Sequence, residues 1–348
     1  MPHRRARAFR IVLHLSRRYA VATARAADLP NGPVMTTGLP FDDFRNLIKA
    51  LPGPNEAARA RAAERNAKLS AQGPSLGRLG GIAEWLAAWT GRDPAVLRPL
   101  VALFAGTHKG VAGSRQETQA MVEHAAAGGA LVCQICATND LGLKIFDLAL
   151  HLPVADIAEE PALDERGCAA TMAFGMEAIA GGIDLVCVGA VGVGGTLSAA
   201  ALMAALHGGP ASDWTTAHTG KVERALALHG AHLKDPLEAL RRLGGRELAA
   251  IAGAILAARM EKIPVILDGY ASLAAAAVLK AAEASAIDHC VLGHVSTEPG
   301  MAKAAGVLGL SPILDLSLGD GEGAGAALAA GIVKNAALAH SGMAIRPE

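Results

Sequence analysis

Short apolar runs alternate with longer helical segments from Val101 onward, and this alternation limits the available folds more than any other feature of the sequence. The runs are apolar at consecutive residues rather than at every second one, which is typical of strands buried on both faces of a parallel sheet. We therefore predict an α/β fold, with a parallel sheet covered by helices on both faces. The predicted strands are Val101–Ala105, Leu143–Asp147, Ile183–Val188, Pro264–Leu267, Cys290–Leu292 and Ile313–Leu316.

The helical segments predict a large domain and a smaller one. The helices expected between the strands are Gln116–Ala127, Ala169–Ala180, Leu197–Leu206, Arg246–Arg259, Ala271–Ala284 and Pro299–Val307. Asn55–Gln72 and Ile82–Thr90 precede the sheet and Gly325–His340 follows it, so we expect these three to pack together. The predicted boundaries are residues 35–95 for the N-terminal part of the small domain, 96–322 for the large α/β domain and 323–348 for the helix that returns to the small domain.

The net charge of zero, from 32 basic and 32 acidic residues, combines two unlike parts. Residues 1–34 carry seven arginines and one aspartate, a net charge of +6, which leaves −6 for the rest of the chain. An acidic body argues against a nucleic-acid binder. The basic segment fits an organellar transit peptide, a disordered tail, or a wrongly assigned start with Met35 as the initiator. We favour the tail or the start at Met35.

Cysteine content and charge distribution indicate a reducing compartment and argue against a membrane protein. The five cysteines are odd in number and lie among apolar residues, which does not suit a disulfide framework. Cys133 and Cys136 form a C-x-x-C, which we interpret as two buried small residues rather than a redox or metal site. The longest uncharged stretch, Leu185–Ser212, is long enough to span a membrane, but four glycines divide it, so a span is the weaker interpretation.

A glycine-rich segment, Gly189–Thr196, joins a predicted strand to a predicted helix. Glycines let the backbone approach a ligand closely, and the free amides of a helix N-terminus attract anions. The segment therefore predicts a phosphate site, with a structural glycine turn as the equally weighted alternative. The G-x-G-x-x-G order of dinucleotide-binding folds is missing.

The second glycine-rich junction, Asp315–Gly325, places Glu322 between Gly321 and Gly323. A carboxylate without neighbouring side chains can stand beside a ligand and act as a general base. The alternative is that Glu322 is an acid of the first helical turn, facing the helix dipole. Asp268, His294 and Ser296 also follow predicted strands, where each alone is more simply a helix cap. Their expected convergence at the carboxyl edge of one sheet favours a ligand site.

Seven ordered motifs together resemble one family, the nicotinate-nucleotide–dimethylbenzimidazole phosphoribosyltransferases of cobalamin assembly. The motifs are Ser75–Leu79, Gly128–Ala130, Gly189–Thr196, Leu243–Glu247, Leu267–Tyr270, Gly293–Ser296 and Gly321–Gly323. The resemblance implies a Rossmann-like parallel sheet, a small helical domain, a homodimer and a cytoplasmic enzyme. It also implies phosphoribosyl transfer from nicotinate mononucleotide to 5,6-dimethylbenzimidazole, giving α-ribazole 5′-phosphate and nicotinate.

The resemblance further implies roles for individual residues. Glu322 corresponds to the catalytic glutamate, Ser75 and Leu76 help to form the aromatic pocket, and Lys221 is the candidate for a phosphate-binding lysine. The remaining substrate-binding positions are Gly192, Gly194, Gly195, Thr196, Asp268, His294, Ser296, Gly321 and Gly323. We expect no metal, no cofactor, no nucleic acid and no membrane among the partners.

Some motifs depart from the family pattern. The family's G-E-M-G-I-G-N-T-T appears as Gly189–Leu197 without its acid, its amide and one of its hydroxyls. The pair Gly319-Asp320 replaces Arg-Leu before Glu322, which puts a second carboxylate near the expected base, and the segment after Trp214 is shorter by several residues. Two hypotheses follow: an active phosphoribosyltransferase, and a catalytically impaired homologue that binds a benzimidazole or nucleotide without turnover.

Overall fold

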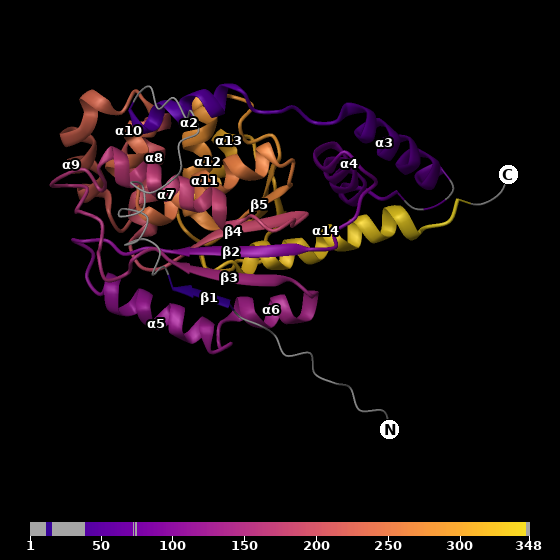
Figure 1. The fold of residues 1–348 in the computed structure, drawn as a ribbon, viewed down its shortest axis with the longest axis horizontal. Helices are drawn as coiled ribbons and strands as arrows, with labels where there is room; N and C mark the ends of the chain where they lie inside the picture. The colour runs from indigo at the N-terminus through magenta and orange to yellow at the C-terminus, as the bar shows by residue number, and fades with distance from the viewer. Residues whose placement is uncertain (1–11, 16–38, 72, 74, 346–348) are drawn as a thin grey trace, which may run out of the picture.

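A parallel sheet runs through the centre of the molecule (Figure 1). The structure is a computed structural model that describes residues 12–15, 39–71, 73 and 75–345. The strands are β1 (Val12–Leu15), β2 (Pro99–Ala105), β3 (Gly142–Asp147), β4 (Leu185–Val191), β5 (Val265–Leu267), β6 (Cys290–His294) and β7 (Pro312–Leu314). Their order is β1-β3-β2-β4-β5-β6-β7, and every neighbouring pair is parallel. The six predicted strands and the predicted parallel sheet are confirmed.

Helices cover both faces of the sheet, as predicted. The helices are α2 (Pro40–Lys49), α3 (Glu56–Ala71), α4 (Arg78–Thr90), α5 (Ser114–Ala126), α6 (Leu131–Asn139), α7 (Glu165–Ala178), α8 (Gly195–His207), α9 (Thr219–His229), α10 (Pro236–Leu243), α11 (Arg246–Met260), α12 (Gly269–Ala282), α13 (Met301–Leu308) and α14 (Ala324–Gly342). Helices α5, α6 and α14 share a buried cluster with one face of β2, and α7, α8 and α10–α13 share another with its opposite face. Because successive side chains of a strand point to opposite faces, a fully apolar β2 supplies both clusters.

The sheet order reverses between β2 and β4, since β3 lies on the other side of β2. The loops that leave β2 and β4 therefore diverge, and ligands of open α/β sheets bind at the carboxyl ends of the strands at such a point. Gly106–His108 follows β2, and Gly192–Thr196, part of the glycine-rich segment singled out in the sequence, follows β4.

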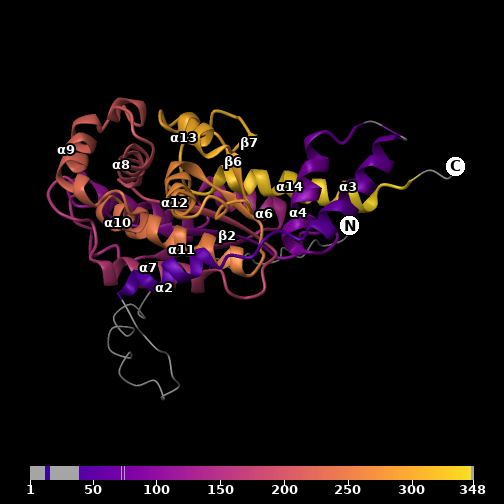
Figure 2. The ribbon, with the colours of Figure 1, turned by 90° about the horizontal axis from the view of Figure 1, so that it is seen from above.

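The small helical unit consists of α3, α4 and the C-terminal part of α14, which extends beyond the sheet (Figures 1 and 2). Arg65 of α3 donates through Nε to the carbonyl oxygen of His340, 2.7 Å away, near the end of α14. Helix α2 lies within the range of 35–95 that was predicted for this unit, but it packs elsewhere. It packs against α7 of the large domain, where Phe41 and Phe44 are buried and the Phe41 amide donates to the Glu165 carboxylate. Among the described residues of that range, α3 and α4 pack on α14.

Strand β1 is the only described part of the basic N-terminal segment. It pairs in parallel with β3, with Val12 opposite Lys144. The other residues of 1–34 lie outside the described residues, so the origin of this segment stays a prediction.

The uncharged stretch Leu185–Ser212 forms β4, the glycine loop and α8 inside the large domain. Among the described residues, one helical stretch, Ser114–Asn139, is long and apolar enough to cross a membrane by length and composition. That stretch contains two helices, α5 and α6, which are separated at Gly128 and Gly129 and lie against the sheet.

Candidate active site

A cavity of about 60 Å³ lies at the carboxyl edge of the sheet, where the loops after β4, β5 and β7 meet. It is lined by Met121, Ala190, Gly192, Gly195, Thr196, Asp268, Ala271, Asp320, Gly321 and Glu322. The structure thus brings the two predicted glycine-rich junctions to one place. The apolar lining from Met121 and Ala271 was not anticipated, because neither residue belongs to a strand end or a recognisable motif.

The glycine loop after β4 leads into α8 by a sharp turn that only glycine allows. Gly194 is the N-cap with a φ of 119°, and a Cβ there would lie 2.8 Å from the His108 ring. The loop is tied to α5, because the Val193 amide donates to Thr118 Oγ1 at 3.0 Å and Ser114 Oγ donates to the Val193 carbonyl oxygen at 2.5 Å. The backbone is therefore held rigidly at the start of α8.

The first turn of α8 provides amides for an anion. Gly195 and Thr196 are its first residues, and the N–H groups of a first helical turn have no acceptor within the helix. Both residues line the cavity. Free amides and the positive end of the helix dipole favour a phosphate at this place.

A buried pair of side chains, His108 and Glu247, lies under the glycine loop. The distance from His108 Nε2 to Glu247 Oε1 is 2.7 Å, and both residues are almost inaccessible to solvent. Burial opposes ionisation of Glu247, but His108, a backbone amide and Arg246 together hold the pKa of Glu247 below its ordinary value. Sequence reasoning did not select these residues as a pair, although Glu247 lies within the Leu243–Glu247 motif.

Glu322 stands at the N-terminal end of α14 in an unusual backbone conformation. Its φ is 59°, a left-handed conformation that costs a residue with a side chain about 1–2 kcal/mol. Its amide donates to the carbonyl oxygen of Ala190 at the end of β4, at 3.0 Å. Such strained residues persist where surrounding contacts hold them, and they cluster at functional sites.

Asp268 connects the end of β5 to the start of α14. Its carboxylate accepts hydrogen bonds from the amides of Gly323 at 2.9 Å and Ala326 at 2.8 Å. His294, at the end of β6, lies with Nδ1 3.7 Å from Asp268 Oδ1. Burial raises the pKa of Asp268 to about 6, although His294 and the two amides act in the opposite direction. Asp268 thus fixes the start of α14, the helix that follows Glu322, and the buried His294 lies beside the Asp268 carboxylate.

Comparison with known proteins identifies the family that shares this arrangement. A family model described as phosphoribosyltransferase matches residues 51–348. Curated relatives named nicotinate-nucleotide–dimethylbenzimidazole phosphoribosyltransferase include those of Rhizobium rhizogenes, 61% identical over 324 residues, and Rhizobium etli, 61% identical over 327 residues. Each alignment covers 88% of this chain and 96% of the relative. The chain belongs to this family.

A solved structure agrees with that assignment. The crystal structure of nicotinate-nucleotide–dimethylbenzimidazole phosphoribosyltransferase from Thermus thermophilus superimposes with a TM-score of 0.75 at 32% identity. The match covers 82% of this chain and 95% of the other. The family predicted from the seven motifs is confirmed, and so is its α/β fold.

Lys221, the candidate phosphate-binding lysine of this family member, is engaged elsewhere in the structure. Its ammonium group lies 2.7 Å from Asp156 Oδ2 and donates to the carbonyl oxygen of Gly110 at 2.6 Å. Lys221 therefore holds the loop after β2 and does not line the cavity beside Glu322.

Ser75 and Leu76 lie away from Glu322 within one chain. Asn66 of α3 donates to the carbonyl oxygen of Gly80 in the first turn of α4, and the adjacent Arg65 binds the end of α14. Glu322 precedes the opposite end of this 19-residue helix, which spans about 28 Å. A single chain does not bring Ser75 and Leu76 to the cavity.

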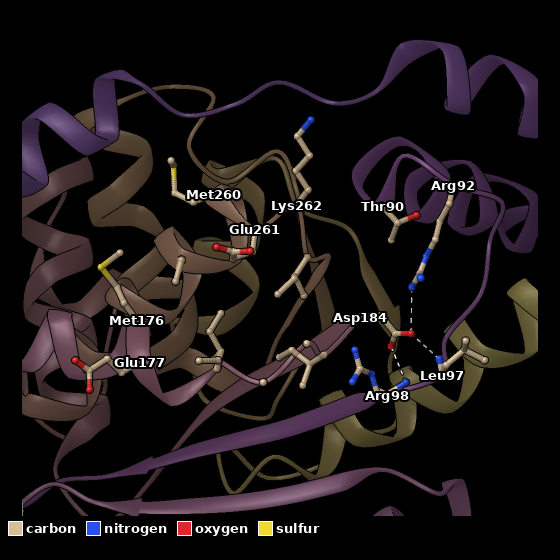
Figure 3. A pocket seen from close by; sticks show the side chains of 17 residues that line it. Thr90, Arg92, Leu97, Arg98, Met176, Glu177, Asp184, Met260, Glu261 and Lys262 are labelled. Carbon is tan, nitrogen blue, oxygen red and sulfur yellow. Dashed lines mark hydrogen bonds and ion pairs between the residues drawn. The ribbon is translucent and has the colours of Figure 1, made fainter.

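A larger cavity, of about 990 Å³, lies at the amino edge of the sheet (Figure 3). Its polar centre is Asp184, which accepts hydrogen bonds from the amides of Leu97 and Arg98, both at 2.8 Å, and pairs with Arg92 at 3.1 Å. These contacts connect the start of β4 to the segment before β2. The smaller cavity is the candidate active site, because the carboxylates of Asp268, Asp320 and Glu322 and the first turn of α8 converge there.

The raised pKa of Asp268 predicts a pH dependence of stability. The folded chain holds this proton more tightly than the unfolded chain, so the contribution is complete below the ordinary pKa of 3.8 and is lost as the pH rises through 6. Urea unfolding of wild type and Asp268→Asn should therefore differ with pH. We expect wild type to lose up to about 3 kcal/mol relative to the variant between pH 4 and 7, at about 1.4 kcal/mol per pKa unit. A difference that does not change with pH would contradict this.

Proposed function

We propose that this protein transfers the phosphoribosyl group of nicotinate mononucleotide to 5,6-dimethylbenzimidazole, giving α-ribazole 5′-phosphate and nicotinate, in the cytoplasm. The observation that carries the proposal is the common cavity of Glu322 and the first turn of α8. A proton acceptor and an anion site that line one cavity are the arrangement that this transfer needs. The relatives at 61% identity support the same substrates.

The proposed chemistry needs one base and a phosphate anchor. Nicotinate leaves a cationic ribosyl bond as a neutral ring nitrogen, so its departure requires no general acid. Dimethylbenzimidazole attacks the anomeric carbon with one ring nitrogen and must lose the proton on the other. Glu322 accepts that proton, while the amides of Gly195 and Thr196 hold the 5′-phosphate. Fixing both substrates in one closed site supplies much of the remaining acceleration.

Nicotinate release tests the proposed reaction. Purified protein is incubated with nicotinate mononucleotide and dimethylbenzimidazole, and nicotinate and α-ribazole 5′-phosphate are measured by chromatography. We expect both products in equal amounts, with release dependent on the benzimidazole. Saturable binding of either substrate without product would instead support the second candidate function, a catalytically impaired homologue. The altered glycine loop, Gly189–Leu197, is the observation that favours this second candidate.

The geometry also supports a homodimer in which each site is completed by the other chain. Pockets that enclose small molecules usually have about 300–1,000 Å³, whereas the cavity beside Glu322 has about 60 Å³. Ser75 and Leu76 belong to the small helical unit and do not line the cavity of their own chain, so we propose that they complete the aromatic pocket of a partner. A two-fold axis gives both sites the same composition.

A hybrid dimer tests this arrangement. We expect Glu322→Gln and Ser75→Asp each to abolish most activity as homodimers, because the first removes the base and the second puts a charge in the aromatic pocket. Ser75 is exposed in the single chain, so its replacement should not disturb folding. Co-expressed with different tags, the two variants give a hybrid with one intact site and about half of the wild-type activity. A hybrid as inactive as its parents would place both residues in the same chain's site.

A further inference from the structure

Asp320 connects the loop before α14 to the start of α12 and to the segment after β6. Its Oδ1 accepts a hydrogen bond from the Tyr270 amide at 2.8 Å and another from Ser296 Oγ at 2.7 Å. The approach is close because Gly269 has no side chain, and a Cβ there would lie 3.0 Å from Asp320 Oδ1 and 3.0 Å from the Gly321 amide nitrogen. Residues Asp320 and Gly321 of the loop that leads to Glu322 therefore lie in close contact with the first turn of α12.

Asp320 and Asp268 form reciprocal caps. Asp268 follows β5 and binds amides at the start of α14, the helix that follows β7. Asp320 follows β7 and binds an amide at the start of α12, the helix that follows β5. Each carboxylate lies at the N-terminal end of the other segment's helix, where it accepts hydrogen bonds from backbone amides. Glu322 lies between the two connections, two residues after Asp320 and two residues before the start of α14.

The left-handed backbone of Glu322 needs such support. Its amide hydrogen bond to Ala190 fixes one side of the loop, and the Gly323 amide fixes the next residue to Asp268. On the N-terminal side, Gly321 also has a positive φ, of 82°, and contributes no side chain. On that side, among the described residues, Asp320 is the residue nearest to Glu322 in sequence whose side chain bonds to other segments, through Tyr270 and Ser296.

We infer that Asp320 is a positioning residue, which holds the carboxylate of Glu322 in its catalytic orientation through hydrogen bonds to Tyr270 and Ser296. The inference rests on the proposed role of Glu322 as the base. It assigns the effect to the acceptor atom Oδ1 rather than to the negative charge. The Gly319-Asp320 departure from the family's Arg-Leu is thus a structural element of this active site and not a sign of its decay.

Two substitutions separate the acceptor atom from the charge. Asp320→Asn keeps an oxygen that can accept from Tyr270 and Ser296, whereas Asp320→Ala removes it. We expect Asp320→Ala to lower kcat by about 10²-fold, the usual effect of a displacement of about 1 Å at a reacting group, with little change in the KM for nicotinate mononucleotide. Asp320→Asn should stay within about threefold of wild type. Asp315→Asn, on an exposed residue of the same loop, is the matched control and should leave kcat unchanged.

A labelling measurement reports on the loop without catalysis. All five native cysteines are buried, so Glu322→Cys gives one accessible thiol for alkylation. In that background we expect Asp320→Ala to raise the alkylation rate severalfold and Asp320→Asn to leave it unchanged. If wild type releases no nicotinate but the labelling rates differ as expected, the proposed reaction fails while the positioning role stands. Within the Glu322→Cys background, an Asp320→Ala variant that is alkylated no faster than its Asp320 parent would overturn the inference. An Asp320→Asn variant with a kcat as low as that of Asp320→Ala would also overturn it.

Discussion

Replacing Glu322 by glutamine should lower kcat for α-ribazole 5′-phosphate formation by about 10²–10⁴-fold, the usual contribution of a general base. Glutamine has nearly the same shape, but its amide cannot accept the proton that dimethylbenzimidazole loses. The KM for nicotinate mononucleotide should change little, because the proposed phosphate site is the first turn of α8 and not Glu322. Steady-state nicotinate release at saturating concentrations of both substrates measures the effect.

A second variant separates the lost base from a disturbed loop. Because the φ of Glu322 is 59°, glycine is the residue that suits this backbone position best. Glu322→Gly should therefore fold at least as stably as wild type and be as inactive as Glu322→Gln. Wild-type rates in the glutamine variant would remove Glu322 from the mechanism and leave the base to be found among the other carboxylates of the cavity.

Alanine at Gly253 should cause a large loss of stability. Helices α7 and α11 approach so closely that a Cβ at Gly253 would lie 1.9 Å from the Met172 carbonyl oxygen, and one at Gly175 would lie 1.9 Å from the carbonyl oxygen of Ala250. Both obstacles are backbone atoms within helices, which cannot move aside as a side chain can. We expect Gly253→Ala to destabilise the protein by about 2–3 kcal/mol through overpacking, measured by urea unfolding.

Gly306 provides the matched control for that substitution. It also lies within a helix, α13, but a Cβ there would meet no atom within 4 Å. Alanine at this position should stabilise the protein by about 0.5–1 kcal/mol, because alanine has the higher helix propensity. Stability of Gly253→Ala within about 0.5 kcal/mol of wild type would show that α7 and α11 can separate without cost.

The local order of the chain was predictable from its residue pattern. Continuous apolar runs identified the six strands from β2 to β7, because strands of a parallel sheet covered on both faces lack a regular alternation of apolar and polar residues. Glycines marked the turns after β4 and before α14, since few other residues adopt a positive φ there. The packing of α2 on α7 of the large domain was not predicted, because the apolar face of an amphipathic helix does not identify the surface that it covers.

The site was predictable as a set of strand ends but not as a set of contacts. Gly195, Thr196, Asp268 and Glu322 meet at one cavity, as a parallel sheet requires of residues that follow its strands. The bonds of Asp320 to Tyr270 and Ser296, and the pairing of His108 with Glu247, join segments that lie far apart in the chain. No local pattern encodes such distances.

By itself, the sequence determined the parallel sheet, the glycine turns and the position of a lone glutamate between two of them. These properties depend on backbone conformation and on alternation of apolar and polar residues, which are local. The tertiary structure alone decided that Lys221 pairs with Asp156, that Asp268 and Asp320 cap each other's helices, and that Ser75 does not line the cavity beside Glu322. Those outcomes depend on how helices cross the sheet, and the crossings follow from packing of the whole core rather than from any one segment.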